Sequence, residues 1–134
     1  MARIRTIKPE AFASESLAAL SLEAERSFFG LLTQVDDQGR VKDRPMVLNG
    51  SLWALRPNHT SADMEADIAA LVENGLGCRY EVDGLKVFHL PTFTTHQVIA
   101  RPSKAKLPPC PHHDQAPAAP QEPSQATETL PGID

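Results

Sequence analysis

Apolar residues recur at helical spacing in the segment LEAERSFFGLLTQV, which begins directly after Ser21. The apolar stripe consists of Ala24, Phe28, Leu31, Leu32 and Val35. This spacing predicts an amphipathic helix with one face toward a core, and the Ser21 hydroxyl is its expected N-terminal cap. Ser14 is expected to cap a shorter turn before it, and the run Asp-Asp-Gln-Gly at 36–39 predicts the turn that ends the helix.

A very short strand and a second helix are predicted next. Val41 is the expected centre of the strand, and Asp43 is the expected cap of the helix. Pro45 falls in the first turn of that helix, where no backbone amide donor is needed. The run Arg-Pro-Asn at 56–58 is expected to end the helix.

A third helix is predicted to begin at Thr60, with Asp63 placed to complete a capping box. Its apolar stripe consists of Met64, Ile68, Leu71 and Val72. Gly75 fits the left-handed residue that ends many helices, with Leu76 folding back onto the helix. The chain therefore has three helices before its strongest strand pattern begins.

That strand pattern is the dipeptide Asp83–Gly84 between CRYEV and LKVFHL, which predicts a β-hairpin with a two-residue type I′ turn. The turn sets Val82 opposite Leu85 and Cys78 opposite His89. Because side chains alternate along a strand, one face of the hairpin is apolar and is expected to pack on the helices. This face consists of Cys78, Tyr80, Val82, Leu85, Val87 and His89.

The other face of the hairpin carries Arg79, Phe88 and the charge pair of Glu81 with Lys86, and we expect it to face solvent. Three helices followed by such a hairpin predict an α+β, mainly helical fold, a winged helix-turn-helix. A disordered C-terminal tail is expected beyond it.

A chain of 134 residues is long enough for one ordinary domain. From Leu107 onward the sequence is rich in Pro, Ala, Gln and Ser and nearly lacks large apolar residues, so we predict disorder there. We expect a basic N-terminal arm at 1–12, the winged helix-turn-helix domain at 13–100, and a basic segment followed by the Pro-rich tail at 101–134.

Nothing in the sequence indicates a membrane or an export signal. No apolar run approaches the length of a bilayer span, and the basic N-terminus lacks the apolar stretch of a secretory signal. Cys78 and Cys110 lie far apart in different kinds of segment, which favours two reduced thiols over a disulfide. A cytoplasmic protein is the resulting expectation.

Residues that could support catalysis or metal binding are scattered. No glycine-flanked nucleophile or phosphate-binding loop is present, so we predict neither an enzyme nor a cofactor. The run from Cys110 to Asp114, CPHHD, contains metal-ligand residue types but lies in the Pro-rich tail without a second cluster nearby. Cys78 and His89 would supply only two ligands, and a packed pair is the simpler interpretation. We predict no metal site.

Charge is strongly segregated within a net charge of −4. Basic segments at 1–8 and 101–106 flank a body at 9–100 that holds seven Lys and Arg against thirteen Asp and Glu. Basic arms of this kind indicate a polyanionic partner such as duplex DNA, although basic termini can also serve solubility alone. The candidate DNA contacts in the arms and on the hairpin are Arg3, Arg5, Lys8, Arg79, Lys86, Arg101, Lys104 and Lys106.

Four segments taken together resemble one known family. They are MARIRTIKPE, VDDQGRVKDRP, GLGCRYEVDG and THQVIARPSKAKLPP, in this order. The chain resembles small helix-turn-helix proteins of actinobacterial phages and prophages, which are related to the N-terminal domains of phage replication-initiation proteins. The resemblance covers nearly all of 1–109 and implies a winged-helix fold, DNA binding and a role near phage replication or its regulation. Arg3, Arg5, Lys8 and Arg101 are the basic positions matched by residue. The chain departs from the family in PTFTTHQ, where an aromatic-containing segment such as Asn-Trp is expected.

The third helix complicates the DNA hypothesis because it carries four acids and no Lys or Arg. Acids in its first turn can serve as caps, but Asp67 and Glu73 lie outside that turn and would repel phosphate. We therefore expect DNA contacts from the arms and the hairpin. The alternative is a protein-interaction module, in which Asp67 and Glu73 dock on a basic surface of a replication or transcription protein.

Overall fold

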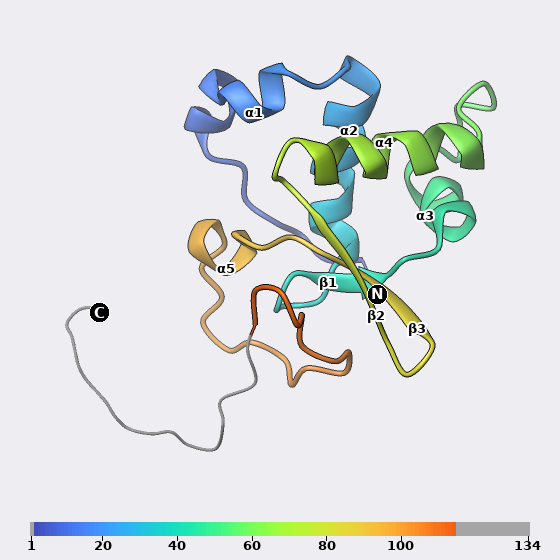
Figure 1. Cartoon of the computed structure of the whole chain (residues 1–134). Coiled ribbons are helices and arrows are strands. Elements are labelled where there is room, and N and C mark those ends of the chain that lie inside the picture. The colour runs from blue at the N-terminus through green and yellow to red at the C-terminus, as the bar shows by residue number, and fades with distance from the viewer. Residues whose placement is uncertain (1, 115–134) are drawn as a thin grey trace, which may run out of the picture.

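The computed structural model describes residues 2–114, which form an α+β fold of five α-helices and a three-stranded antiparallel sheet (Figure 1). A short 3-10 helix, Pro9–Ala13, precedes them. The helices are α1 (Glu15–Ala18), α2 (Leu22–Gln34), α3 (Pro45–Leu52), α4 (Ser61–Glu73) and α5 (Phe93–His96). The strands are β1 (Arg40–Lys42), β2 (Cys78–Val82) and β3 (Leu85–His89), in the sheet order β1-β3-β2.

The predicted helix ends are confirmed for α1, α2 and α4. The Ser14 hydroxyl accepts a hydrogen bond from the N–H of Leu17, and Ser21 caps α2 in the same way. Thr60 and Asp63 form a complete capping box at the start of α4. Gly75 has a φ of +76°, the left-handed conformation expected at the end of that helix.

The second predicted helix, α3, is shorter than expected. Its N-terminal cap is Arg44, and Asp43 instead accepts hydrogen bonds from the guanidinium of Arg79. The helix ends at Leu52, because the backbone turns at Trp53 ahead of the expected stop at 56–58. Helix α5 was not expected at all: its sequence, FTTH, is too short to show a helical period.

The hairpin has the predicted register. Cys78 pairs with His89 and Val82 with Leu85, and the turn residues Asp83 and Gly84 both have positive φ. Strand β1 pairs antiparallel with the other edge of β3, which places β3 at the centre of the sheet. The short strand predicted around Val41 is thus the third member of the sheet.

The prediction of which hairpin face meets the helices is wrong. The fully buried Phe88 lies in the main core with Leu71 of α4, and Val41 packs on the same cluster. Gly77 permits this approach, since a Cβ there would lie only 2.5 Å from the Phe88 ring. Both faces of the hairpin are buried: Phe88 meets the helices, and Tyr80 and Val87 on the other face form a second apolar cluster with Cys110.

The prediction of disorder from Leu107 onward is also wrong for residues 107–114. These residues cover the hairpin face that was expected to meet the helices, on the side of the sheet away from α2 and α4 (Figure 1). Cys110 is fully buried, and the hydroxyl of Tyr80 donates to the carbonyl oxygen of Pro108 at 2.5 Å. The rest of the predicted tail, 115–134, lies outside the described residues.

Within residues 2–114, the helices are all too short or too polar to cross a bilayer.

Candidate nucleic-acid interface

The N-terminal arm and the segment after α5 meet at one buried carboxylate, that of Asp37 in the turn between α2 and β1. Arg3 Nη1 lies 2.7 Å from Oδ2, and Arg5 Nη1 lies 3.2 Å from Oδ1. The backbone N–H of Ser103 donates to Oδ2 at 2.7 Å. This Ser103 hydrogen bond, followed by those of the two arginines, holds the pKa of Asp37 well below its usual range against the opposing effect of burial. We call Arg3, Arg5, Asp37 and Ser103 the terminal clasp.

Of the clasp residues, Arg5 is the one whose side chain makes hydrogen bonds to several backbone carbonyls as well as to Asp37. Its Nε donates to the carbonyl oxygen of Leu32, and its Nη2 donates to those of Val35 and Asp36. The side chain is 6% exposed, and its guanidinium lies 4.9 Å from the centroid of the Phe93 ring. It satisfies carbonyls at the C-terminal end of α2, where a cation is favourable. The structure corrects the prediction that Arg5 contacts DNA, because its side chain is buried against internal acceptors.

The remaining contacts of the two arms are also internal. Thr6 and Gln97 exchange hydrogen bonds through the backbone of Thr6 and the side-chain amide of Gln97. Arg3 donates to the Ser103 hydroxyl, and Gln38 donates to the Ser103 carbonyl oxygen. Three of the four segments that carry the phage-protein resemblance therefore meet at the clasp. Nothing in the local sequence pattern indicates this meeting, since it joins residues separated by up to 100 positions.

Arg79 on the hairpin is paired with two acids. Its Nε donates to Asp43 at 2.7 Å, and Nη1 and Nη2 donate to the carboxylate of Glu65 at 2.6 and 2.7 Å. The pKa of Glu65 is lowered, chiefly by the hydrogen bonds from Arg79. Arg79 therefore links the hairpin to α4 through Glu65 and to the start of α3 through Asp43, and little of its charge is available to phosphate.

The acids of α4 are mostly accounted for inside the molecule. Asp63 closes the capping box, and Glu65 pairs with Arg79. Asp67 is only 7% exposed and accepts a hydrogen bond from the Ser27 hydroxyl at 2.7 Å. The structure corrects the prediction that Asp67 docks on a partner protein, because it faces α2. Glu73 alone among these acids is exposed and unpaired within residues 2–114.

Asp67 belongs to a buried polar network that joins three helical segments. His59 Nε2 lies 2.8 Å from the Asp67 carboxylate, and its Nδ1 lies 2.6 Å from Oδ1 of Asn49. The indole N–H of Trp53 donates to the Ser27 hydroxyl at 3.0 Å, and the indole stacks on the His59 ring at 3.6 Å between centroids. A polar network whose members satisfy one another fixes a unique arrangement of the elements that carry it.

Five of the predicted contacts remain exposed. Within the part of the chain that the structure describes, no acid lies within ion-pair distance of any of them. They are Lys8, Lys86, Arg101, Lys104 and Lys106. Lys86 stands beside the hairpin turn, and Lys106 precedes Leu107, which packs in the same cluster as Val82 and Leu85.

A separate group of metal-ligand side chains lies between the hairpin and the segment 107–114, which itself supplies two of them. Sγ of Cys78, Sγ of Cys110 and a ring nitrogen of His113 all lie within 4.8 Å of one another. In the sequence, Cys78 was paired with His89 and the run Cys110–Asp114 was treated separately, because the tail was expected to be disordered. The Cys-x-x-His spacing of 110–113 was the available signal. Burial raises the pKa of Cys78 to about 11, which makes this thiol a poor nucleophile at neutral pH.

No family model, curated protein or solved structure matches this chain.

Proposed function

We propose that this protein is a winged-helix DNA-binding protein that contacts duplex DNA through its hairpin and the basic segment 101–106. The order of the elements supports the winged-helix assignment: α2, β1, α3, α4 and then the β2–β3 hairpin, with β1 completing the sheet. In this assignment the hairpin is the wing. The phage-protein resemblance supports a role in phage DNA replication or its regulation.

The observation that carries the proposal is the different fate of the two kinds of charge. Five predicted basic contacts stay exposed without a paired acid among residues 2–114, whereas most acids of α4 are used in caps, ion pairs or the core. The repulsion that four acids would exert on phosphate is therefore much smaller than the sequence indicates. Cations that keep their full charge at the surface can displace counterions from DNA, which is the main source of its affinity for proteins.

Helix α4 still offers no Lys or Arg donor to a base edge or a phosphate. Sequence readout through this helix in a major groove would need such donors or polar amides on its exposed face. We therefore place the DNA at the wing and at the basic segment 101–106, which carry Lys86 and Lys106, and expect binding with weak sequence preference.

The alternative, a protein-interaction module with an acidic docking helix, loses most of its basis. Asp67 is buried and Glu65 is paired, so Glu73 is the one α4 acid outside the first turn that could meet a basic partner. A single exposed carboxylate contributes little to a protein interface.

A salt titration of binding to duplex DNA tests the proposal. The triple change Arg101→Ala, Lys104→Ala and Lys106→Ala should weaken binding and reduce the slope of log K against log salt by about 0.9 for each phosphate that is no longer neutralised. Lys86→Ala should act in the same direction with a smaller change. Fluorescence anisotropy with a labelled duplex measures both quantities.

Arg56→Ala is the control, because Arg56 is also exposed but lies in the loop before α4. It should leave affinity and salt slope unchanged. The proposal is overturned if the wild-type protein binds no duplex at low salt, or if the control lowers the slope as much as the triple variant does. Circular dichroism of each variant checks that the fold is kept.

A further inference from the structure

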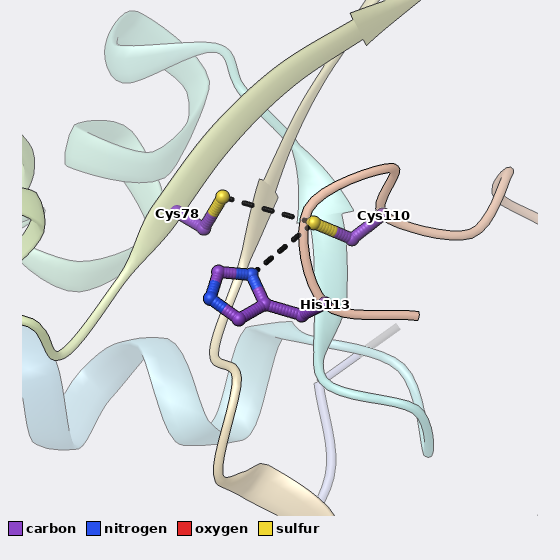
Figure 2. Close-up of side chains that lie close together, drawn as sticks. All are labelled: Cys78, Cys110 and His113. Atoms are coloured by element: carbon purple, nitrogen blue, oxygen red, sulfur yellow. Dashed lines mark hydrogen bonds between the residues drawn. The ribbon is translucent and has the colours of Figure 1, made fainter. Parts of the chain in front are cut away.

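Three metal-ligand side chains point toward one another between the hairpin and the C-terminal segment (Figure 2). Cys78 is the first residue of β2, and Cys110 and His113 lie on one turn of the segment that covers it. The two sulfur atoms are 3.7 Å apart, and Sγ of Cys110 lies 3.4 Å from Nδ1 of His113. The first two side chains are buried, and His113 closes the group from the solvent side.

Two of the three separations match the edges of a zinc coordination tetrahedron, and the third, between Cys78 and His113, is at most 4.8 Å. Zn–S bonds of about 2.3 Å and Zn–N bonds of about 2.0–2.1 Å at tetrahedral angles put two sulfurs about 3.8 Å apart and a sulfur and a nitrogen about 3.5 Å apart. The observed S–S and S–N distances of 3.7 and 3.4 Å lie close to both values. The thiols are free, and their separation is far longer than the bond of about 2.05 Å in a disulfide.

Contacts outside the cluster hold the segment in place. The N–H of Asp114 donates to the carbonyl oxygen of Cys110 and closes the turn, and the Asp114 carboxylate lies 3.1 Å from Nη2 of Arg40. Tyr80 donates to the carbonyl oxygen of Pro108 from the same hairpin face. The ligands are therefore positioned by the fold on both sides, and little rearrangement is needed to accept an ion.

A fourth side chain with an unmet polar atom lies beside this group. His89 faces Cys78 directly across the hairpin, is only 2% exposed, and has a buried Nδ1 with no hydrogen-bond partner within the described residues. Its ring centroid is 5.9 Å from that of His113. Its other ring nitrogen, Nε2, lies 3.3 Å from the Asp114 carboxylate. A buried imidazole nitrogen without a partner is uncommon, but His89 lies outside the group of three side chains whose ligand atoms are within 4.8 Å of one another, so it lies beside the site and not in it.

We propose that Cys78, Cys110 and His113 bind Zn²⁺, with the fourth position left to a water molecule. Thiolate and imidazole ligands in a tetrahedral arrangement select zinc over hard cations such as Mg²⁺ or Ca²⁺. The ion fastens residues 107–114 to the hairpin, so the segment carrying Lys106 is held beside the wing. This role differs from DNA binding itself and is tested separately from it.

The experiment uses the full chain without a histidine tag, purified under reducing conditions. Elemental analysis should find about one zinc per chain. Titration of the metal-free protein with Co²⁺ should produce the visible d–d bands of a tetrahedral site and a thiolate-to-cobalt charge-transfer band. Competition with zinc then gives the affinity of each variant.

His113→Ala should weaken zinc binding by more than about tenfold, and Cys110→Ser should also remove one thiolate contribution from the charge-transfer band. His112→Ala is the matched control, because the His112 side chain is next to His113 in the chain but is exposed and lies outside the cluster. It should bind zinc as the wild type does. Since His113 is exposed, its replacement is expected to leave the fold intact even if Cys110→Ser does not.

The proposal is overturned if the wild type shows no thiolate-to-cobalt band, or if the His112 and His113 variants bind zinc equally. A thiol titration that finds Cys78 and Cys110 joined in a disulfide in the purified protein would also contradict it. If zinc does not bind but the DNA affinity is as proposed, only the metal site is refuted. If zinc binds but duplex DNA does not, only the proposed function is refuted.

Discussion

Two buried carboxylates, Asp37 and Asp67, have almost the same exposure, 5% and 7%, but quite different surroundings. Asp37 is held by two guanidinium groups and a backbone N–H from opposite ends of the described chain. Asp67 is held by a hydroxyl and an imidazole within the helical part of the fold. The first connects termini to the body, and the second connects helices to one another.

The difference shows what a charge pattern leaves open. In the sequence, Arg3 and Arg5 belong to a basic arm and Asp67 belongs to an acidic helix, and each set suggests a surface for a partner. In the structure, Arg5 and Asp67 are interior groups whose partners come from other elements. A charged side chain is buried only where such partners exist. The charges available to a binding partner are therefore those of the side chains that form no ion pair or hydrogen bond inside the protein.

The largest expected effect is that of Asp37→Ala. This change leaves the buried guanidinium of Arg5 without its carboxylate, and an uncompensated charge of this kind costs about 3–5 kcal/mol of unfolding free energy. It should also release the segment around Ser103. Urea unfolding measures the loss, and hydrogen exchange at the Arg3 and Ser103 amides measures the release.

Glu73→Ala is the control for Asp37→Ala, since this acid is exposed on α4 and should change stability by less than about 0.5 kcal/mol. A loss below about 1 kcal/mol for Asp37→Ala would show that the arms are not held by this carboxylate. In that case Arg3 and Arg5 would again be candidate DNA contacts.

A smaller loss is expected from Asp67→Ala. Removing the acceptor leaves the Ser27 hydroxyl and His59 without one hydrogen-bond partner in the core, which costs about 1–3 kcal/mol. Asp67→Asn should cost less, because an amide oxygen can still accept from Ser27. Trp53 is the chain's one tryptophan and donates to that same hydroxyl, so its fluorescence reports the change directly. Equal stability of the Ala and Asn variants would contradict a hydrogen-bonding role for Asp67.

The sequence predicted local structure well at several points where one residue decides it, although not at Asp43, which pairs with Arg79 and does not cap α3. Ser21 and Thr60 cap their helices, and Asp83–Gly84 sets both the hairpin turn and its register. Each of these features depends on contacts between neighbours in the chain, which short patterns contain. The short strand predicted at Val41 is also present, as β1.

Features that depend on distant contacts could not be predicted in this way. Which hairpin face meets the helices depends on Phe88 filling a space beside Gly77 and α4, and spacing within the hairpin does not contain that information. The folding of residues 107–114 was missed because composition gives the number of apolar residues in a segment but not whether a surface elsewhere in the molecule can bury them. Cys110 and Leu107 suffice here, because the hairpin already offers them an apolar face.

The smallest expected effect concerns the ion pair of Glu65 with Arg79, which provides an exposed counterpart to the two buried acids. The pKa of Glu65 is lowered in the folded state, so its stabilisation is present above the unfolded value of 4.5 and is lost as the pH falls through the folded value. Because the Glu65 side chain is 51% exposed, solvent screens the pair and the loss should stay below about 1 kcal/mol.

Glu65→Gln should therefore flatten the pH dependence of the unfolding free energy just below pH 4.5, relative to the wild type. The contribution of Asp37 follows the same sign but appears at lower pH, because its folded pKa lies further below the unfolded value of 3.8. Urea unfolding across the acid range separates the two. If Glu65→Gln removed as much stability as Asp37→Ala, the link between the hairpin and α4 would equal the terminal clasp in strength, and burial would not be what distinguishes the two acids.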